Sequence, residues 1–136
     1  MNIQILKRVI VILIISLISI TASAEILNFR SKAYSQREVK YNQWTEWSNW
    51  ESSNVLIAMD LNTDVITIFS RRIQKYYVYD YSDVYYDHMA KCIDYNFYDQ
   101  DGDRGTMSLV IKPDGQSEIY IRFANIQWAY IVVRTQ

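Results

Sequence analysis

Cysteine, glycine, proline and histidine are all scarce in this 136-residue sequence, which has one cysteine, three glycines, one proline and one histidine. A single cysteine cannot form an intrachain disulfide, which excludes disulfide-rich secreted scaffolds and cysteine-based metal sites. The sequence also lacks a phosphate-binding glycine loop, a G-x-S-x-G nucleophile motif and an H-E-x-x-H zinc motif. We therefore expect a protein that is not an enzyme and that needs no cofactor.

The few residues able to do chemistry have simpler interpretations. The lone histidine, His88, falls in a polar loop and is expected to be solvated. Cys92 falls in a strand pattern, where a small buried apolar role is more common than a nucleophilic one. Asp80 and Asp94 could face one another across strands, so a hydrolase that uses paired carboxylates is a third, weaker hypothesis.

The first 24 residues have the composition of a cleavable signal peptide. Lys7 and Arg8 make a positive start, residues 9–20 form an apolar run, and residues 22–24 (Ala-Ser-Ala) precede a cleavage site at Glu25. The apolar run is shorter than the roughly 20 residues that a membrane-spanning helix needs. We predict a signal helix over residues 1–24, export to the periplasm or the extracellular space, and no membrane span after cleavage.

The mature chain that this cleavage would leave, residues 25–136, is acidic. It loses Lys7 and Arg8 but no acid, so the 14 basic residues become 12 against 15 acidic ones, a net charge of −3. Nucleic acids and anionic membranes attract basic surfaces, so we expect neither as the partner. A chain of this length is expected to fold as one domain.

Aromatic residues are abundant, with 12 tyrosines, four tryptophans and four phenylalanines, all after residue 24. Aromatic and β-branched residues favour strands. From Trp44 onward, apolar–polar alternation and turn signals recur at intervals of about ten residues, a spacing typical of barrels and sandwiches. The clearest turns are at 61–64, 99–105 and 112–116, and no segment has the helical period.

These patterns predict an all-β fold, an antiparallel up-and-down meander of about eight strands that closes into a small barrel because closure removes unpaired edges. Residues 25–42 are polar without a clean period and are predicted as an N-terminal arm that can hold a first edge strand. Residues 43–136 are predicted as the barrel domain. A barrel of this size is filled by side chains or holds one small ligand. Alternation predicts that its interior is lined by Ile93, Tyr95, Phe97, Leu109, Ile121 and Trp128.

Three tryptophans are spaced W-x-x-W-x-x-W at Trp44, Trp47 and Trp50. The spacing is similar to that of thrombospondin type 1 repeats and of the W-S-x-W-S box of cytokine receptors. Both families need several disulfides and arginines stacked on the tryptophans, and the sequence shows neither pattern. On a strand, Trp44 and Trp50 share one face. We expect these two rings to plug a barrel end and Trp47 to cover an edge or contact a partner.

The tyrosine-rich stretch 76–88 suggests a contact surface. Some of its rings must point outward, where a phenol can stack on a sugar or donate a hydrogen bond to a partner. With Trp47, the residues Tyr77, Tyr79 and Tyr81 are predicted to be the contacts of a non-enzymatic binding module. The partner would be a protein or a glycan. The alternative hypothesis is a carrier that holds a small apolar ligand inside the barrel.

Three carboxylates alternate in the turn at 99–105, namely Asp99, Asp101 and Asp103. Carboxylates at alternate positions can converge on Ca²⁺. However, counting Asp99 as the first position, the sixth is Arg104 instead of glycine and the twelfth is Val110 instead of glutamate, so this is not an EF-hand loop. We expect a solvated turn, and a low-affinity calcium site is the alternative.

Four segments resemble a group of small uncharacterised exported β proteins from Gram-negative gut bacteria. The resemblance spans about residues 41–133 and implies export and a single domain, with no assigned activity. In topology alone, the meander is similar to the calycin group, which includes the lipocalins. The segments are W-T-E-W-S-N-W-E (44–51), D-V-I-T-I-F-S (64–70), D-Q-D-G-D-R-G-T (99–106) and I-Y-I-x-F-A-N-I-Q-W-A-Y (119–130).

Overall fold

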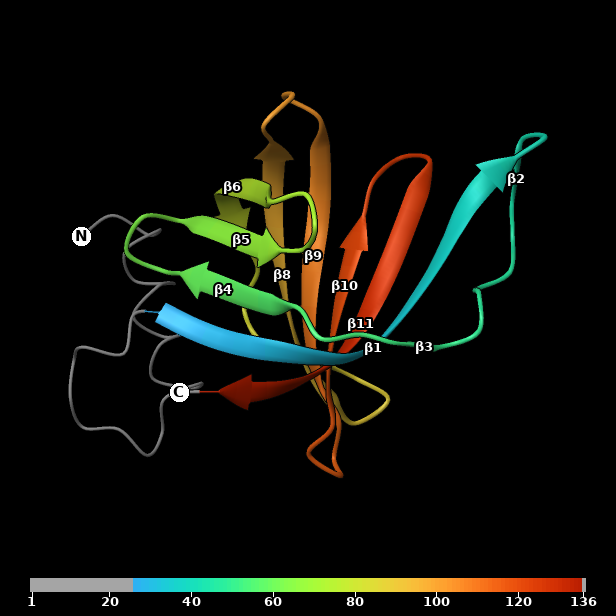
Figure 1. Ribbon diagram of the computed structural model, residues 1–136. Coiled ribbons are helices and arrows are strands. Elements are labelled where there is room, and N and C mark those ends of the chain that lie inside the picture. The colour runs from blue at the N-terminus through green and yellow to red at the C-terminus, as the bar shows by residue number, and fades with distance from the viewer. Residues whose placement is uncertain (1–25, 136) are drawn as a thin grey trace.

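The computed structural model describes residues 26–135, so the predicted signal peptide at 1–24 lies outside the described residues. None of the described residues belongs to a helix that is long and apolar enough to cross a membrane. The regular structure is entirely β (Figure 1). The strands are β1 (Ile26–Lys40), β2 (Gln43–Trp44), β3 (Glu51–Ser52), β4 (Leu56–Asp60), β5 (Val65–Phe69), β6 (Gln74–Tyr81), β7 (Tyr85–Asp87), β8 (Ala90–Asp99), β9 (Arg104–Ile111), β10 (Ser117–Arg122) and β11 (Ile126–Thr135).

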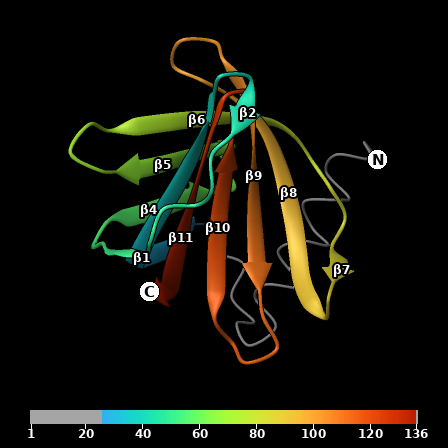
Figure 2. The ribbon, with the colours of Figure 1, turned by 90° about the vertical axis from the view of Figure 1, so that its right-hand side faces the viewer.

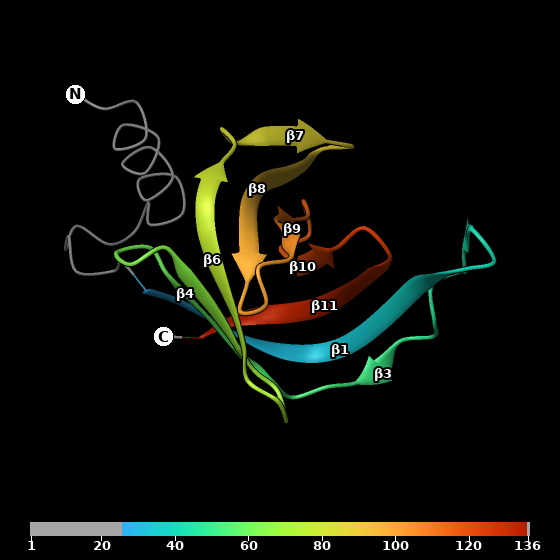
Figure 3. The same cartoon turned by 90° about the horizontal axis from the view of Figure 1, so that it is seen from above.

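Eight of these strands form a closed antiparallel barrel. The hydrogen-bonded order is β1-β4-β5-β6-β8-β9-β10-β11, and β11 pairs back with β1. Figure 2 shows β8 to β11 side by side, and Figure 3 looks onto the barrel from above. The short strands β2 and β3 pair with β1 outside this ring, and β7 pairs with β8. The predicted meander of about eight strands closing into a barrel is confirmed, and it is consistent with a lipocalin-like topology.

The segment predicted as an N-terminal arm instead closes the barrel, which corrects that prediction. Most of residues 25–42 belong to β1, a 15-residue strand whose first part pairs with β4 and whose longer part pairs with β11. A shift in register between Ser31 and Ala33 explains why the sequence has no clean period there. Such a bulge moves the inward face to the other parity. Phe29 is buried before the bulge, and Tyr34 packs against the core after it.

Alternate residues of the barrel strands point inward and fill the interior. Five of the six predicted lining residues are no more than 2% exposed, and Trp128 is partly buried against the same cluster. Rings dominate one region, where Phe97 lies 4.4 Å from Tyr76 and 5.5 Å from Phe123 between centroids. The buried cluster consists of Leu27, Phe29, Ile57, Met59, Ile66, Ile68, Tyr76, Tyr81, Ile93, Tyr95, Phe97, Met107, Leu109, Ile119, Ile121, Tyr130 and Val132.

Candidate binding groove

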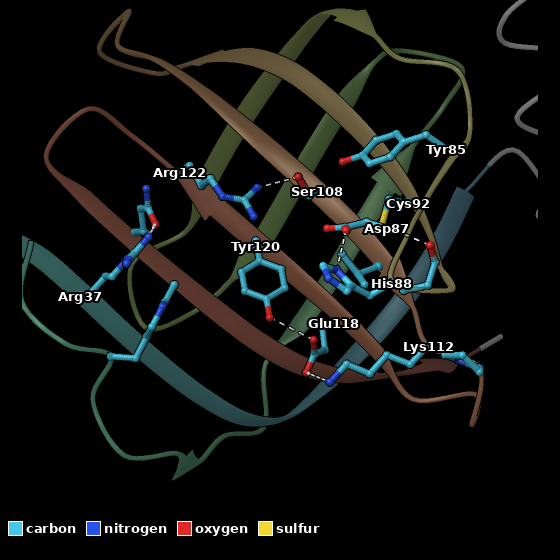
Figure 4. A pocket seen from close by; sticks show the side chains of 15 residues that line it. Arg37, Tyr85, Asp87, His88, Cys92, Ser108, Lys112, Glu118, Tyr120 and Arg122 are labelled. Carbon is cyan, nitrogen blue, oxygen red and sulfur yellow. Dashed lines mark hydrogen bonds and ion pairs between the residues drawn. The ribbon is translucent and has the colours of Figure 1, made fainter.

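A groove of about 490 Å³ lies on the outer face of β8, β9 and β10 (Figure 4). Outward-facing side chains of these strands form its floor. The hairpin of β7 and β8 lines one part of it, and Trp47, from the loop that follows β2, lines another. Most of the side chains that it exposes are polar or charged. They include Arg37, Tyr85, Asp87, His88, Ser108, Lys112, Glu118, Tyr120, Arg122 and Gln127.

Strand register places two arginines in one row across the groove. Arg122 on β10 is opposite Gln127 on β11, and Gln127 is opposite Arg37 on β1. The Arg37 guanidinium donates two hydrogen bonds to Gln127 Oε1, at 3.0 and 2.8 Å. It also lies over two aromatic rings, 5.1 Å from the centroid of Trp44 and 4.9 Å from that of Trp47. No arginine near the tryptophans in the sequence had the spacing that predicts stacking. In the folded protein, Arg37 of β1 takes that position.

The three tryptophans lie outside the barrel, so the prediction that two of them plug a barrel end is wrong. Trp44, Trp47 and Trp50 are 40%, 37% and 48% exposed. Their loop folds back along β1, where Ser35 Oγ donates a hydrogen bond of 2.6 Å to the carbonyl oxygen of Ser48. Most of the loop has no regular strand pairing, which explains why simple strand alternation did not place its rings.

A chain of polar side chains crosses the groove floor from β10 to β8. Arg122 Nη1 donates to Ser108 Oγ at 2.6 Å, and Ser108 Oγ donates to Asp94 Oδ1, also at 2.6 Å. Tyr85 Oη completes the chain, with distances of 2.9 and 3.0 Å to the two carboxylate oxygens of Asp94. Burial and this hydrogen bond raise the pKa of Tyr85 to about 12. Ser108 is only 3% exposed, so its two partners satisfy a buried hydroxyl.

A buried carboxylate anchors a second cluster in the groove. Glu118 is 4% exposed, and it accepts from Tyr120 Oη at 3.0 Å and from Gln116 Nε2 at 3.2 Å. Lys112 Nζ forms an ion pair with the same carboxylate at 3.2 Å. Burial and the charge of Glu118 raise the pKa of Tyr120 to about 12. The Tyr120 ring meets Trp47 edge-on, with the ring centroids 6.1 Å apart.

The hairpin of β7 and β8 turns through a tight two-residue loop. Asp87 is opposite Ala90, and the two residues between them, His88 and Met89, have φ of +48° and +68°. Positive φ at both positions is the signature of a type I′ turn. His88 Nδ1 lies 2.7 Å from Asp87 Oδ1, and the His88 side chain is 96% exposed. The structure therefore places His88 in a solvated turn, as expected.

Cys92 lies in β8 beneath this hairpin and is 4% exposed. Burial raises the pKa of its thiol, and the nearby carboxylates of Asp87 and Asp94 raise it further. A nucleophilic cysteine needs the opposite shift, because the thiolate is the reactive form. The structure therefore favours the expected role of Cys92 as a small buried side chain.

Of the four predicted contact residues, Tyr81 is misplaced. It is 7% exposed and lies inside the barrel, 6.1 Å from Tyr95 between ring centroids. The cause is a bulge at Tyr79, because Val78 is opposite Phe97 while Asp80 is opposite Asn96, the next residue back. The extra residue turns the following side chain from the outer face to the inner one.

Tyr77 and Tyr79 point outward, in a patch that does not include Trp47. Both pack against Tyr98, at 5.9 and 6.0 Å between ring centroids, and Tyr79 and Tyr98 are stacked. The guanidinium of Arg104 lies over Tyr79 at 5.8 Å. These tyrosines form an aromatic patch on β6 and β8, whereas Trp47 belongs to the groove. The predicted contact surface is thus divided between two places.

The acidic turn brings its three carboxylates together. One oxygen from each of Asp99, Asp101 and Asp103 lies within 4.8 Å of the others. Asp99 Oδ1 already accepts hydrogen bonds from the backbone N–H groups of Asp101 and Asp103, both at 2.9 Å. Asp99 therefore shapes the turn, and calcium binding there stays a prediction.

Arg37, Ser108, Glu118 and Arg122 were not singled out from the sequence. For Glu118 and Arg122 there was a signal, because both alternate with buried isoleucines in β10 and so face outward. Nothing local indicated that Arg37 would join them. No family model, curated protein or solved structure matches this chain.

Proposed function

We propose that this protein is an exported, non-enzymatic binding module and that the groove on β8, β9 and β10 is its recognition surface. The observation that carries the proposal is that Arg37 and Arg122 both line this groove and that, within residues 26–135, neither forms an ion pair with a carboxylate. Their hydrogen-bond partners, Gln127 and Ser108, are neutral. A guanidinium without a counter-charge is ready to bind an anionic group.

The acidic side chains of the groove support the same interpretation. Of the two carboxylates that line the groove, Glu118 is paired with Lys112, and Asp87 lies 2.7 Å from His88 Nδ1. The neighbouring Asp94 accepts hydrogen bonds from Tyr85 and Ser108. These carboxylates are already used within the protein. The positive charge that remains available to a ligand is therefore that of the two arginines, even though the predicted mature chain is acidic as a whole.

Export is supported by the composition of residues 1–24, a basic start followed by an apolar run and a small-residue cleavage site. It predicts a mature N-terminus at Glu25. Mass spectrometry of the protein from cell fractions tests this directly. Full-length protein confined to the cytoplasm would contradict export but would leave the proposal about the groove unaffected.

An array of neutral and acidic oligosaccharides and peptides tests the groove. We expect Trp47→Ala to remove most of the binding seen with the unaltered protein, because Trp47 is an exposed ring of the groove. Tyr98→Ala is the matched control, since it removes an exposed ring from the aromatic patch instead. Binding that survives Trp47→Ala but is lost with Tyr98→Ala would assign recognition to the patch. An unaltered protein that retains nothing on the array would count against a binding module.

A carrier of a small apolar ligand is the second candidate. It is favoured by two polar atoms, Tyr95 Oη and Trp128 Nε1, that are buried and have no hydrogen-bond partner in the described structure. Buried polar groups are normally satisfied, so a ligand with a polar end could serve them. Native mass spectrometry of the purified protein would then show an added mass that organic solvent removes. A single species at the mass of the chain would contradict the carrier.

A further inference from the structure

We infer that the ligand of the groove is a carboxylate-bearing glycan, with its acid group held by Arg37 and Arg122 and a sugar ring lying against Trp47 and Tyr120. This inference rests on the proposed function of the groove and names the class of ligand. Figure 4 shows Arg37, Arg122 and Tyr120 facing this same groove.

The two guanidinium groups are held in place before any ligand arrives. Arg37 is fixed by Gln127 and by the rings of Trp44 and Trp47, and Arg122 lies 5.0 Å from the centroid of Tyr120. Their strands are separated only by β11, so their Cα atoms lie roughly 10 Å apart at the usual strand spacing. Side chains that are already ordered lose little freedom on binding, which favours affinity. Each guanidinium keeps free N–H donors in the geometry that suits a carboxylate.

The aromatic side chains beside the arginines suit a sugar ring. Trp47 is 37% exposed and meets Tyr120 edge-on, so the two rings offer an apolar surface next to the positive charge. A sugar has an apolar face of C–H groups that can pack on such a surface. Its hydroxyl groups need hydrogen-bond partners, and the groove offers the amide of Gln127 and the phenol of Tyr85.

The same groove fits an acidic peptide or a nucleic acid less well. An extended peptide binds most readily by adding to an unpaired strand edge, but β8, β9 and β10 each have a neighbour on both sides. A nucleic acid carries closely spaced phosphates along its whole length. Those phosphates would meet the exposed carboxylate of Asp87, which also lines the groove. A short acidic glycan needs no strand edge, and it carries fewer charges in total than a nucleic acid strand.

Isothermal titration of the purified protein with a galacturonate hexamer at low salt tests the inference. The fully methyl-esterified hexamer is the matched ligand, since it keeps the sugar rings and removes the charges. We expect the acid to bind and the ester to bind about tenfold to a hundredfold more weakly, because charge-assisted hydrogen bonds are lost. Arg37→Gln and Arg122→Gln should each weaken binding of the acid about tenfold.

Arg104→Gln is the control variant, because Arg104 also lies on a tyrosine ring but outside the groove. It should leave the affinity unchanged. Arg122 also supports Ser108, so thermal unfolding of each variant is measured in parallel. Arg122→Lys, which keeps the charge but loses the planar donor geometry, should bind the acid more weakly than the unaltered protein and more tightly than Arg122→Gln. If Arg122→Gln does not fold, Arg122→Lys and the comparison of acid with ester decide the question.

Four outcomes would overturn this inference. They are equal binding of acid and ester, tighter binding of a sulfated dextran hexamer that has no carboxylate, tighter binding of a glutamate hexapeptide, and no binding of the galacturonate acid. After any of these outcomes the groove can still be the recognition surface, provided that binding on the array still depends on Trp47. Loss of that dependence would instead contradict the proposed function itself.

Discussion

The inner and outer faces of β8, β9 and β10 are built from alternate residues of the same strands, yet they are organised differently. On the inner face, Phe97, Leu109 and Ile121 are at most 1% exposed and are held by apolar packing alone. On the outer face, Ser108 is nearly as buried, but it depends on the particular groups that it contacts, Asp94 and Arg122. An apolar side chain accepts many neighbours, whereas a buried polar one needs the right partner.

The largest expected effect is loss of the fold in alkali, where both faces contribute. Burial raises the pKa of Tyr76, Tyr95 and Tyr130 inside the barrel, and raises that of Tyr85 and Tyr120 outside it to about 12. The unfolded chain titrates near the ordinary pKa of 10. The folded state therefore holds these protons longer, so the stabilisation is complete below pH 10 and is lost as the pH rises toward 12. Denaturant unfolding at a series of pH values checks this, and constant stability from pH 9 to 12 would contradict it.

Next in size is removal of a large inner side chain. Phe97→Ala should lower the free energy of unfolding by about 3–5 kcal/mol, because Phe97 is fully buried among other rings. Its neighbour Tyr98 faces outward and is 45% exposed, so Tyr98→Ala should cost about 1 kcal/mol or less. Urea unfolding of the two variants compares the faces directly. Equal costs would mean that the interior is less tightly packed than the burial indicates.

A smaller effect should come from adding one methyl group. A Cβ at Gly105 would lie 2.7 Å from Phe97 Cζ and 2.8 Å from the carbonyl oxygen of Arg122. Gly105→Ala should therefore cost about 1–3 kcal/mol through overpacking. Phe97→Leu removes the ring atoms that make one of these two contacts. The double variant should then cost less than the sum of the single ones. Strict additivity in urea unfolding would show that the Phe97 contact is not the cause.

A smaller effect than that of Gly105→Ala is expected from the hydrogen-bonded side chains of the outer face. Ser108→Ala should cost about 1–2 kcal/mol, since it leaves Arg122 and Asp94 without the hydroxyl that joins them. Asp94→Asn should lower the free energy of unfolding less in the Ser108→Ala variant than in the unaltered protein, because the two residues belong to one network. Thr106→Ala, which removes a single hydrogen bond to Asn96, is the control on the same strand. A cost for Ser108→Ala no greater than that of the control would mean that the chain of hydrogen bonds contributes nothing to stability.

Local pattern was sufficient for most of the barrel and for little of the groove. Ile93, Tyr95 and Phe97 were assigned to the interior correctly, because alternation within a strand follows from the pleat. Simple alternation gave the wrong face for Tyr81, since a bulge at Tyr79 inserts one residue that no local signal marked. A similar register shift after Ser31 interrupts the alternation in β1, and residues 25–42 were therefore predicted as an arm.

The amino-acid sequence by itself determined the strand class, the positions of the turns, the apolar inner face and the absence of an intrachain disulfide. All of these depend on residues close together in the chain or on composition. Only the tertiary structure decided that β1 closes the barrel and that Arg37 shares a row with Arg122. The physical reason is register, because which residues face each other on paired strands depends on bulges and on closure of the whole sheet.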